Sequence, residues 1–288
     1  MPPLRSALIG EFLGTALLVF LGDGVVASVF LLNKEADWIV ITTGWGLAVT
    51  LGIYLSGRLS GGHLNPAVTL ALMVRGDFPA NRVVPYWSAQ MAGAFVGALV
   101  MYLDYGAAFS AFEQAHGITR GALLNGDLAG PAAGGAAVFA NYPAFPGLAR
   151  NLLSEFLGTA VLLLGVRALT DRRNAAPGGY LEPVLIGALV WAIGLCLGGL
   201  TGYAINPARD LGPRVASYFC GWGPAVFVSH GFYFWVPVIA PLVGGVCGAT
   251  LYDLAIGRNL PPLAEPTPPG QLSPGAPTAE QDVPVGVA

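Results

Sequence analysis

Six stretches of this sequence are apolar and long enough to cross about 30 Å of membrane hydrocarbon. They cover residues 7–31, 38–57, 83–104, 149–169, 181–200 and 232–256. Only 10% of the residues are charged, whereas a soluble domain usually carries about 25%. Because backbone in lipid has to satisfy its own hydrogen bonds, these stretches predict an all-α membrane protein with six transmembrane helices.

Two further apolar segments, 66–74 and 207–218, are too short to cross a membrane, and each begins at an Asn-Pro pair. Non-helical chain at membrane depth has to line a cavity or be buried in protein. Asparagine is a favourable helix N-cap, and proline suits the first helical position. We therefore predict two re-entrant half-helices. They begin at two Asn-Pro-Ala motifs, formed by Asn65, Pro66, Ala67, Asn206, Pro207 and Ala208.

The two halves of the chain resemble each other. Residues 10–22 read GEFLGTALLVFLG and are matched by SEFLGTAVLLLG at 154–165, while GGHLNPAVT at 61–69 is matched by GYAINPARD at 202–210. Three spans in each half place the second half in the opposite orientation, which is an inverted-topology repeat. We expect one channel domain over 1–258, with halves at 5–104 and 149–258 joined by an extracellular loop at 105–148.

The distribution of basic residues predicts the orientation. If both termini are cytoplasmic, the inner side receives eight arginines, whereas the outer loops receive only Lys34, Arg120 and Arg150. The inner arginines are Arg5, Arg58, Arg75, Arg82, Arg167, Arg172, Arg173 and Arg258. Residues 259–288 are rich in Pro and Gly, and we expect a disordered cytoplasmic tail. The predicted location is the plasma membrane, which is the inner membrane if the source is bacterial.

The two predicted half-helices would enter from opposite faces and meet at their N-termini. Each N-terminus carries about half a positive charge, so neutral polar molecules could pass where protons and cations are repelled. The backbone carbonyls before each motif could form two ladders of hydrogen-bond acceptors. These carbonyls belong to Gly61, Gly62, His63, Leu64, Gly202, Tyr203, Ala204 and Ile205.

In these features the sequence resembles the aquaporin, or major intrinsic protein, family, and more closely its aquaglyceroporin branch. The resemblance covers residues 5–258 and is carried by Glu11, Glu155, HLNPAVT and NPARD. It implies a six-helix bundle with two half-helices, one pore per subunit and a homotetramer. It also implies a passive channel for glycerol, water, urea and other small polyols rather than an enzyme.

The resemblance places the outer constriction of the pore at Trp45, Gly194, Tyr203 and Arg209. Water-selective members have a histidine at the Gly194 position, where glycine leaves room for a carbon skeleton. Trp45 and Tyr203 would face the CH groups of glycerol, while Arg209 would donate to its hydroxyls. Tyr203 stands where a bacterial-type glycerol facilitator has Phe, which leaves the balance between water and glycerol open.

Five other polar side chains lie beside the predicted pore. Glu11 and Glu155 are expected to brace the loops by accepting backbone N–H bonds, and a proton relay is the alternative. Asp210 lies four residues before Arg214, which predicts a structural pair that braces the second half-helix. His63 is expected to brace its loop or to act as a pH-responsive gate.

Other functions are less consistent with the sequence. A coupled transporter needs an ion-coordinating site open to its pathway, and a water-selective channel remains the alternative within the family. The net charge of −3, without a basic run, argues against nucleic-acid binding. Neither a catalytic triad nor metal-ligand spacing is present, and Cys196, Cys220 and Cys247 lack such spacing, so no cofactor or metal is expected.

Overall fold

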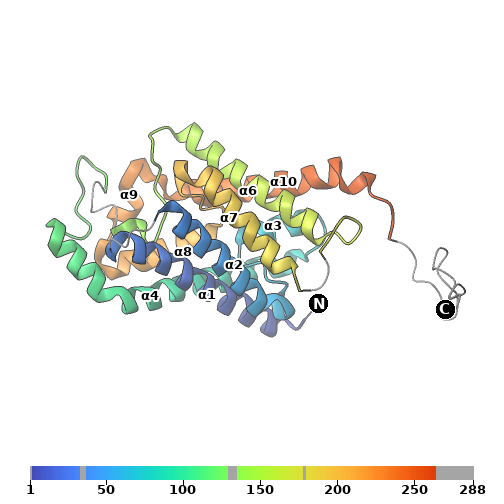
Figure 1. Cartoon of the computed structure of the whole chain (residues 1–288), viewed down its shortest axis with the longest axis horizontal. Helices are drawn as coiled ribbons and strands as arrows, with labels where there is room; N and C mark the ends of the chain where they lie inside the picture. Colours follow the sequence, from blue (N-terminus) through green and yellow to red (C-terminus); the bar gives the residue numbers. More distant parts are fainter. Residues whose placement is uncertain (1, 33–36, 129–134, 178–179, 264–288) are drawn as a thin grey trace, which may run out of the picture.

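The computed structural model describes residues 2–32, 37–128, 135–177 and 180–263. These residues are mostly helical, and six of their helices are long and apolar enough to cross a membrane. The six helices are α1 (Leu4–Leu32), α2 (Trp38–Ser60), α4 (Val83–His116), α6 (Leu148–Thr170), α7 (Glu182–Thr201) and α10 (Val236–Ala255). They run along the length of the molecule in Figure 1. The predicted all-α membrane fold is confirmed.

Two short helices, α3 (Pro66–Val74) and α8 (Pro207–Ser217), lie between the long ones (Figure 1). Each begins at the proline that the sequence predicts. The Asn65 Oδ1 atom accepts from the backbone N–H of Ala67 at 2.8 Å, and Asn206 Oδ1 accepts from Ala208 at 3.0 Å. Asparagine therefore caps both half-helices.

Small residues allow the long helices to pack at equivalent places in the two halves. A Cβ atom on Gly93 of α4 would lie 2.3 Å from the Phe12 carbonyl oxygen of α1. A Cβ atom on Gly244 of α10 would likewise lie 2.3 Å from the carbonyl oxygen of Phe156 in α6. Close backbone approach of this kind is how helices associate in lipid, where the hydrophobic effect does not drive them together.

Two element boundaries differ from the prediction. Helix α4 continues to His116 rather than ending near residue 104, because Phe109 is fully buried and stacks on Phe139 at 5.6 Å. The predicted last span, 232–256, begins four residues later than expected, after a separate short helix. A short helix α9 (Ala225–Phe232) loses helical geometry at 229–231, and α10 begins only at Val236.

The start of α1 and the end of α10 lie at the same end of the bundle, which we call the termini end; α9 lies at the other, the α9 end (Figure 1). The main core cluster includes Leu18, Trp45, Leu163 and Trp222, and a smaller cluster of Ala7, Phe78, Val83 and Tyr86 is separate from it. Most of the tail predicted at 259–288 lies outside the described residues, which stop at Leu263.

Candidate functional site: a cavity between two half-helices

The backbone before each half-helix is held in an unusual conformation. Leu64, Tyr203 and Ile205 have φ values of 51°, 44° and 45°, in the left-handed region that side chains other than glycine rarely adopt. Such residues persist where the surrounding structure holds them. Leu64 and Ile205 are equivalent, because each immediately precedes the asparagine of a motif.

The two buried glutamates hold this backbone. Glu11 accepts from the N–H groups of His63 at 3.0 Å and Leu64 at 2.8 Å. Glu155 accepts from Ala204 at 3.0 Å and Ile205 at 2.9 Å. Both carboxylates are fully buried, and each uses its two oxygens on consecutive N–H groups. This geometry suits a brace, since a proton relay would need a carboxylate facing the pathway.

Replacement of Glu155 by glutamine should disturb its loop. The amide keeps the size of the side chain, but its NH2 group would face one of the two backbone N–H groups. A buried donor left without an acceptor costs about 1–3 kcal/mol, so we expect solute flux to fall by roughly tenfold. Stopped-flow light scattering on reconstituted liposomes measures the flux. Asp37→Asn is the control. It makes the same change from acid to amide at the residue that precedes α2, where the Asp37 side chain makes no capping hydrogen bond. Equal flux in wild type and Glu155→Gln would contradict the brace.

The two motifs are joined to each other at the centre. The Asn65 Nδ2 atom donates to the carbonyl of Ile205 at 2.9 Å, and Asn206 Nδ2 donates to the carbonyl of Leu64 at 2.8 Å. One N–H of each amide thus ties the opposite loop in place. The other N–H of each amide is left for the cavity.

The eight predicted acceptor carbonyls divide into two groups. Those of Leu64 and Ile205 accept the bonds that join the motifs, and that of Gly202 accepts from Asn141 Nδ2 at 2.8 Å. No hydrogen bond from the described residues occupies the carbonyls of Gly61, Gly62, His63, Tyr203 and Ala204. The ladders available to a solute are therefore shorter than predicted.

A single cavity of about 920 Å³ brings most of the predicted residues together. Eleven of them line it: Trp45, Gly61, Gly62, His63, Leu64, Asn65, Tyr203, Ala204, Ile205, Asn206 and Arg209. Apolar side chains, such as those of Ile53, Leu162 and Val190, form another part of its wall. The cavity is therefore lined by both polar groups and apolar side chains.

Arg209 and Trp45 form one side of the predicted constriction. The Arg209 guanidinium carbon lies 3.9 Å from the centre of the Trp45 ring, which is a close cation–π contact. Arg209 is only 7% exposed although it lines the cavity.

The role of Gly194 in the structure differs from the predicted one, in which glycine leaves room in the pore for the solute. A Cβ atom on Gly194 would lie 2.7 Å from Tyr203 Cζ, so the Tyr203 ring occupies the space that glycine leaves. Trp38 holds this arrangement, because its indole N–H donates to the Gly194 carbonyl at 3.0 Å and its ring packs edge-on against Tyr203. Gly194 thus admits Tyr203 rather than opening the cavity directly.

Asp210 and Arg214 form a fully buried pair behind the constriction. Arg214 Nε donates to Asp210 Oδ1 at 2.9 Å, and the other guanidinium nitrogens donate to the carbonyls of Val226 and Asn141 at 2.7 Å each. Asp210 also accepts from the Asn141 N–H at 2.8 Å. The pair therefore anchors the segment around Asn141 to α8, and Asn141 in turn reaches the loop at Gly202.

His63 packs inside its loop. Its Nδ1 lies 3.1 Å from the Thr69 hydroxyl, and its ring contacts those of Phe78 and Tyr86 at centroid distances of 4.8 and 5.2 Å. These contacts favour the bracing interpretation over a gate that swings on protonation.

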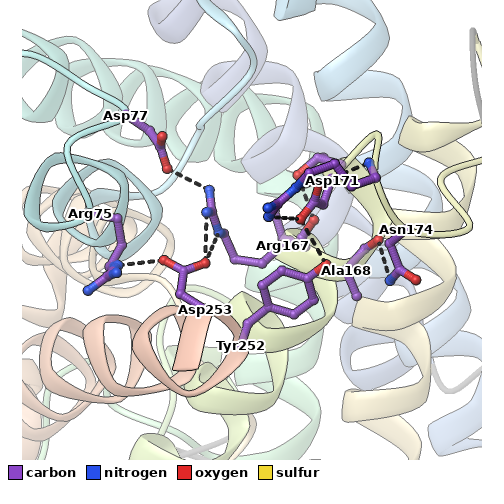
Figure 2. Close-up of polar contacts among 11 residues, drawn as sticks. Arg75, Asp77, Arg167, Ala168, Asp171, Asn174, Tyr252 and Asp253 are labelled. Atoms are coloured by element: carbon purple, nitrogen blue, oxygen red, sulfur yellow. Dashed lines mark hydrogen bonds and ion pairs between the residues drawn. The ribbon is translucent and has the colours of Figure 1, made fainter. Parts of the chain in front are cut away.

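A network that the sequence did not predict lies at the termini end (Figure 2). Arg75, which ends α3, donates to Asp253 of α10 at 2.6 Å, and Arg167 of α6 donates to the same carboxylate at 2.8 Å and to Asp77 at 2.6 Å. We call Arg75, Asp77, Arg167 and Asp253 the termini-end cluster. It ties the far end of the first half-helix to two helices of the other half.

A second ion pair lies beside this cluster in Figure 2. Arg173 donates to Asp171 at 2.8 Å, and Tyr252 reaches the same carboxylate at 3.2 Å. The hydrogen bonds from Arg173 hold the pKa of the Asp171 carboxyl at about 2. Asp171 therefore keeps its charge throughout the physiological range.

Comparisons with known proteins identify a family with which this fold and cavity are consistent. A family model described as major intrinsic protein matches residues 2–252. A probable glycerol uptake facilitator protein of Thermotoga maritima is 47% identical over 251 residues, which cover 86% of this chain and 98% of that protein. A propanediol uptake facilitator of Citrobacter freundii is 42% identical over 261 residues, covering 90% and 94%.

A solved structure is also similar. The aquaglyceroporin from Plasmodium falciparum aligns with a TM-score of 0.76 and 34% sequence identity, covering 87% of this chain and 96% of that one. Within the described residues, no group of three or more His, Cys, Asp or Glu side chains could hold a metal ion.

Proposed function

Because the chain belongs to the major intrinsic protein family, we propose that it is a passive channel for glycerol and other small neutral solutes. Water passes through the same pore, while protons and ions are excluded. The observation that carries this proposal is the cavity itself, in which two capped half-helices meet and the Arg209–Trp45 pair lines one side.

The lining of the cavity suits a polyol. Trp45 and Tyr203 offer aromatic surface to the CH groups, and Arg209 together with the free loop carbonyls offers donors and acceptors to the hydroxyls. Similar proteins are named glycerol and propanediol uptake facilitators, which supports both permeants for this chain. Propanediol has one hydroxyl fewer than glycerol and needs fewer polar partners. Urea, another small neutral molecule, is a further candidate.

Exclusion of protons and cations follows from the charges around the centre. The N-termini of α3 and α8 carry their positive ends toward Asn65 and Asn206, and Arg209 adds a full positive charge. Asn65 and Asn206 each keep one N–H for the cavity, which orients a passing hydroxyl or water as an acceptor.

The setting of the channel is also part of the proposal. We place the termini end in the cytoplasm, where the arginine-rich ends of the spans would lie, and the chain in the plasma membrane as a homotetramer. Exposed apolar side chains on several long helices, such as Leu47, Leu103 and Val243, supply a surface for lipid and for neighbouring subunits.

The test is a side-by-side measurement of water, glycerol, propanediol and urea entry into liposomes that contain the purified protein. We expect glycerol flux to rise linearly with its gradient and to be independent of Na⁺ and of a proton gradient. Saturating, ion-coupled uptake would favour a transporter. Water entry without glycerol entry would favour a water-selective channel.

A further inference from the structure

A groove on the outside of the molecule runs along the start of α1. It has a volume of about 720 Å³ and shares no lining residue with the cavity between the half-helices. Six of its seven lining residues belong to α1, between Leu4 and Leu13, and the seventh is Ala89 of α4. Neither the proposed conduction pathway nor the bracing of the loops uses this surface.

The lining residues of α1 form one face of that helix. Leu4, Leu8 and Phe12 follow one another at intervals of four residues, and a second row with the same interval starts at Arg5. Residues four apart lie on the same side of a helix. The buried side of α1 is formed by other residues, such as Gly10. The groove face is therefore left over after α1 has packed into the bundle.

The packing of α1 on α4 explains why a groove lies there. The two helices lie side by side (Figure 1). At Gly93, one turn beyond Ala89, a Cβ atom would lie 2.3 Å from the Phe12 carbonyl oxygen, so the backbones are in close contact. At Ala89 itself, a methyl group is all that α4 adds to the lining. The groove opens outward, because Ile9 and Leu13 remain 46% and 45% exposed.

The length and chemistry of the groove fit a lipid acyl chain. From Leu4 to Leu13 the helix rises about 14 Å, which is close to the half-thickness of the membrane hydrocarbon, about 15 Å. Arg5 is the one charged residue in the lining, and it lies near the start of α1. An acyl chain along the apolar rows would therefore leave its headgroup beside Arg5.

This end of the groove carries positive charge that no carboxylate balances. None of the ion pairs among the described residues involves Arg5 or Arg82. Arg82 lies at the start of α1 as well, because its Nη1 donates to the carbonyl of Pro2 at 2.9 Å. The arginines of the termini-end cluster, in contrast, are paired with Asp77 and Asp253.

We propose that the groove binds an anionic phospholipid from the membrane leaflet at the termini end. One acyl chain lies along the apolar rows of α1 beside Ala89, and the phosphate pairs with Arg5, while Arg82 adds a second positive charge. Basic pockets of this kind on the cytoplasmic side of transmembrane helices suit anionic headgroups. A zwitterionic lipid also has a phosphate, but its own cation reduces the attraction to the arginines.

Native mass spectrometry of the purified protein in detergent tests the proposal. Phosphatidylglycerol and phosphatidylcholine with the same acyl chains are added in separate titrations. We expect wild type to bind the first phosphatidylglycerol more tightly than phosphatidylcholine. Arg5→Gln should bind it about fivefold more weakly than wild type does, since one arginine near a membrane surface contributes about that factor.

Arg172→Gln is the matched control for the charge. Arg172 is exposed and lies outside the groove, so this variant should bind phosphatidylglycerol as wild type does. Equal binding of the two lipids by wild type would overturn the proposal. So would equal loss of phosphatidylglycerol binding in Arg5→Gln and Arg172→Gln, because the attraction would then belong to the whole surface.

A second pair of variants tests the apolar part of the groove. Ala89→Leu places three more carbon atoms in the groove and should weaken the binding of both lipids. Ala92→Leu makes the same change at an exposed position of α4 outside the groove, and it should bind lipid as wild type does. Equal lipid binding by the two variants would contradict the position of the acyl chain.

A second copy of the chain is the alternative occupant of this face. If the groove were an interface between copies, Ala89→Leu would change the oligomeric state in detergent without added lipid, and that result would overturn the proposal. Light scattering after gel filtration measures this state.

Thermal unfolding supplies a further readout. Phosphatidylglycerol should raise the midpoint of wild type more than that of Arg5→Gln, because a ligand that binds the folded state stabilises it. An equal rise in both would contradict the role of Arg5. These measurements do not depend on which solute the channel conducts, so they remain decisive if the proposed function fails.

Discussion

Replacing Arg214 with methionine should destabilise the channel more than any other single change to its charged residues. The variant leaves the Asp210 charge buried and unpaired, and it removes the donors to the carbonyls of Asn141 and Val226. Breaking a buried ion pair by removing one partner costs about 3–5 kcal/mol. We expect a lower midpoint of thermal unfolding in detergent and less folded protein after purification.

Two further variants test this explanation. Arg173→Met removes an arginine whose ion pair with Asp171 is partly exposed, and its unfolding midpoint should match that of wild type. Asp210→Asn combined with Arg214→Met should recover part of the lost stability, because no uncompensated charge is left. A single Arg214→Met variant as stable as wild type would show that the pair does not anchor the segment around Asn141.

Gly194→Ala should reduce glycerol conduction by roughly tenfold or more. The added methyl group would lie 2.7 Å from Tyr203 Cζ and 2.9 Å from Thr42 Cγ2, so the Tyr203 ring has to move into the cavity that it lines. Water is smaller than glycerol, so we expect water flux to fall less. Stopped-flow measurements of both solutes on one liposome preparation give the comparison.

Gly199→Ala is the control in the same helix, because a Cβ atom at that position meets nothing within 4 Å. Its glycerol flux should equal that of wild type. If Gly194→Ala conducts glycerol as well as Gly199→Ala does, the Tyr203 ring is not held where the structure has it. A histidine at position 194 would displace the same ring, so it does not test pore width alone.

The sequence predicted the fold and the half-helices well because their signals are local. An apolar run has to span, and an Asn-Pro pair after a glycine-rich approach has few alternatives in a membrane. The starts of α3 and α8 at Pro66 and Pro207 therefore agree with the prediction. The end of α4 does not, because Phe109 extends the helix by packing on Phe139, a contact that no local pattern indicates.

Contacts between distant residues account for most of what the sequence left out. The crossed bonds from Asn65 and Asn206 join residues 140 or more positions apart, and the resting place of Tyr203 against Gly194 depends on side-chain packing.

The termini-end cluster also constrains the order in which the protein can be completed. Arg75 and Asp253 are separated by 178 positions in the chain. At about 5–20 residues per second, a ribosome needs roughly 10–35 s to make the chain between them. During that interval Arg75 lacks this carboxylate, and the first half-helix is held at its far end only by the helices already inserted. Insertion of α10, the last span, is therefore the step that fixes the first half of the pore, although every residue of that half was made long before.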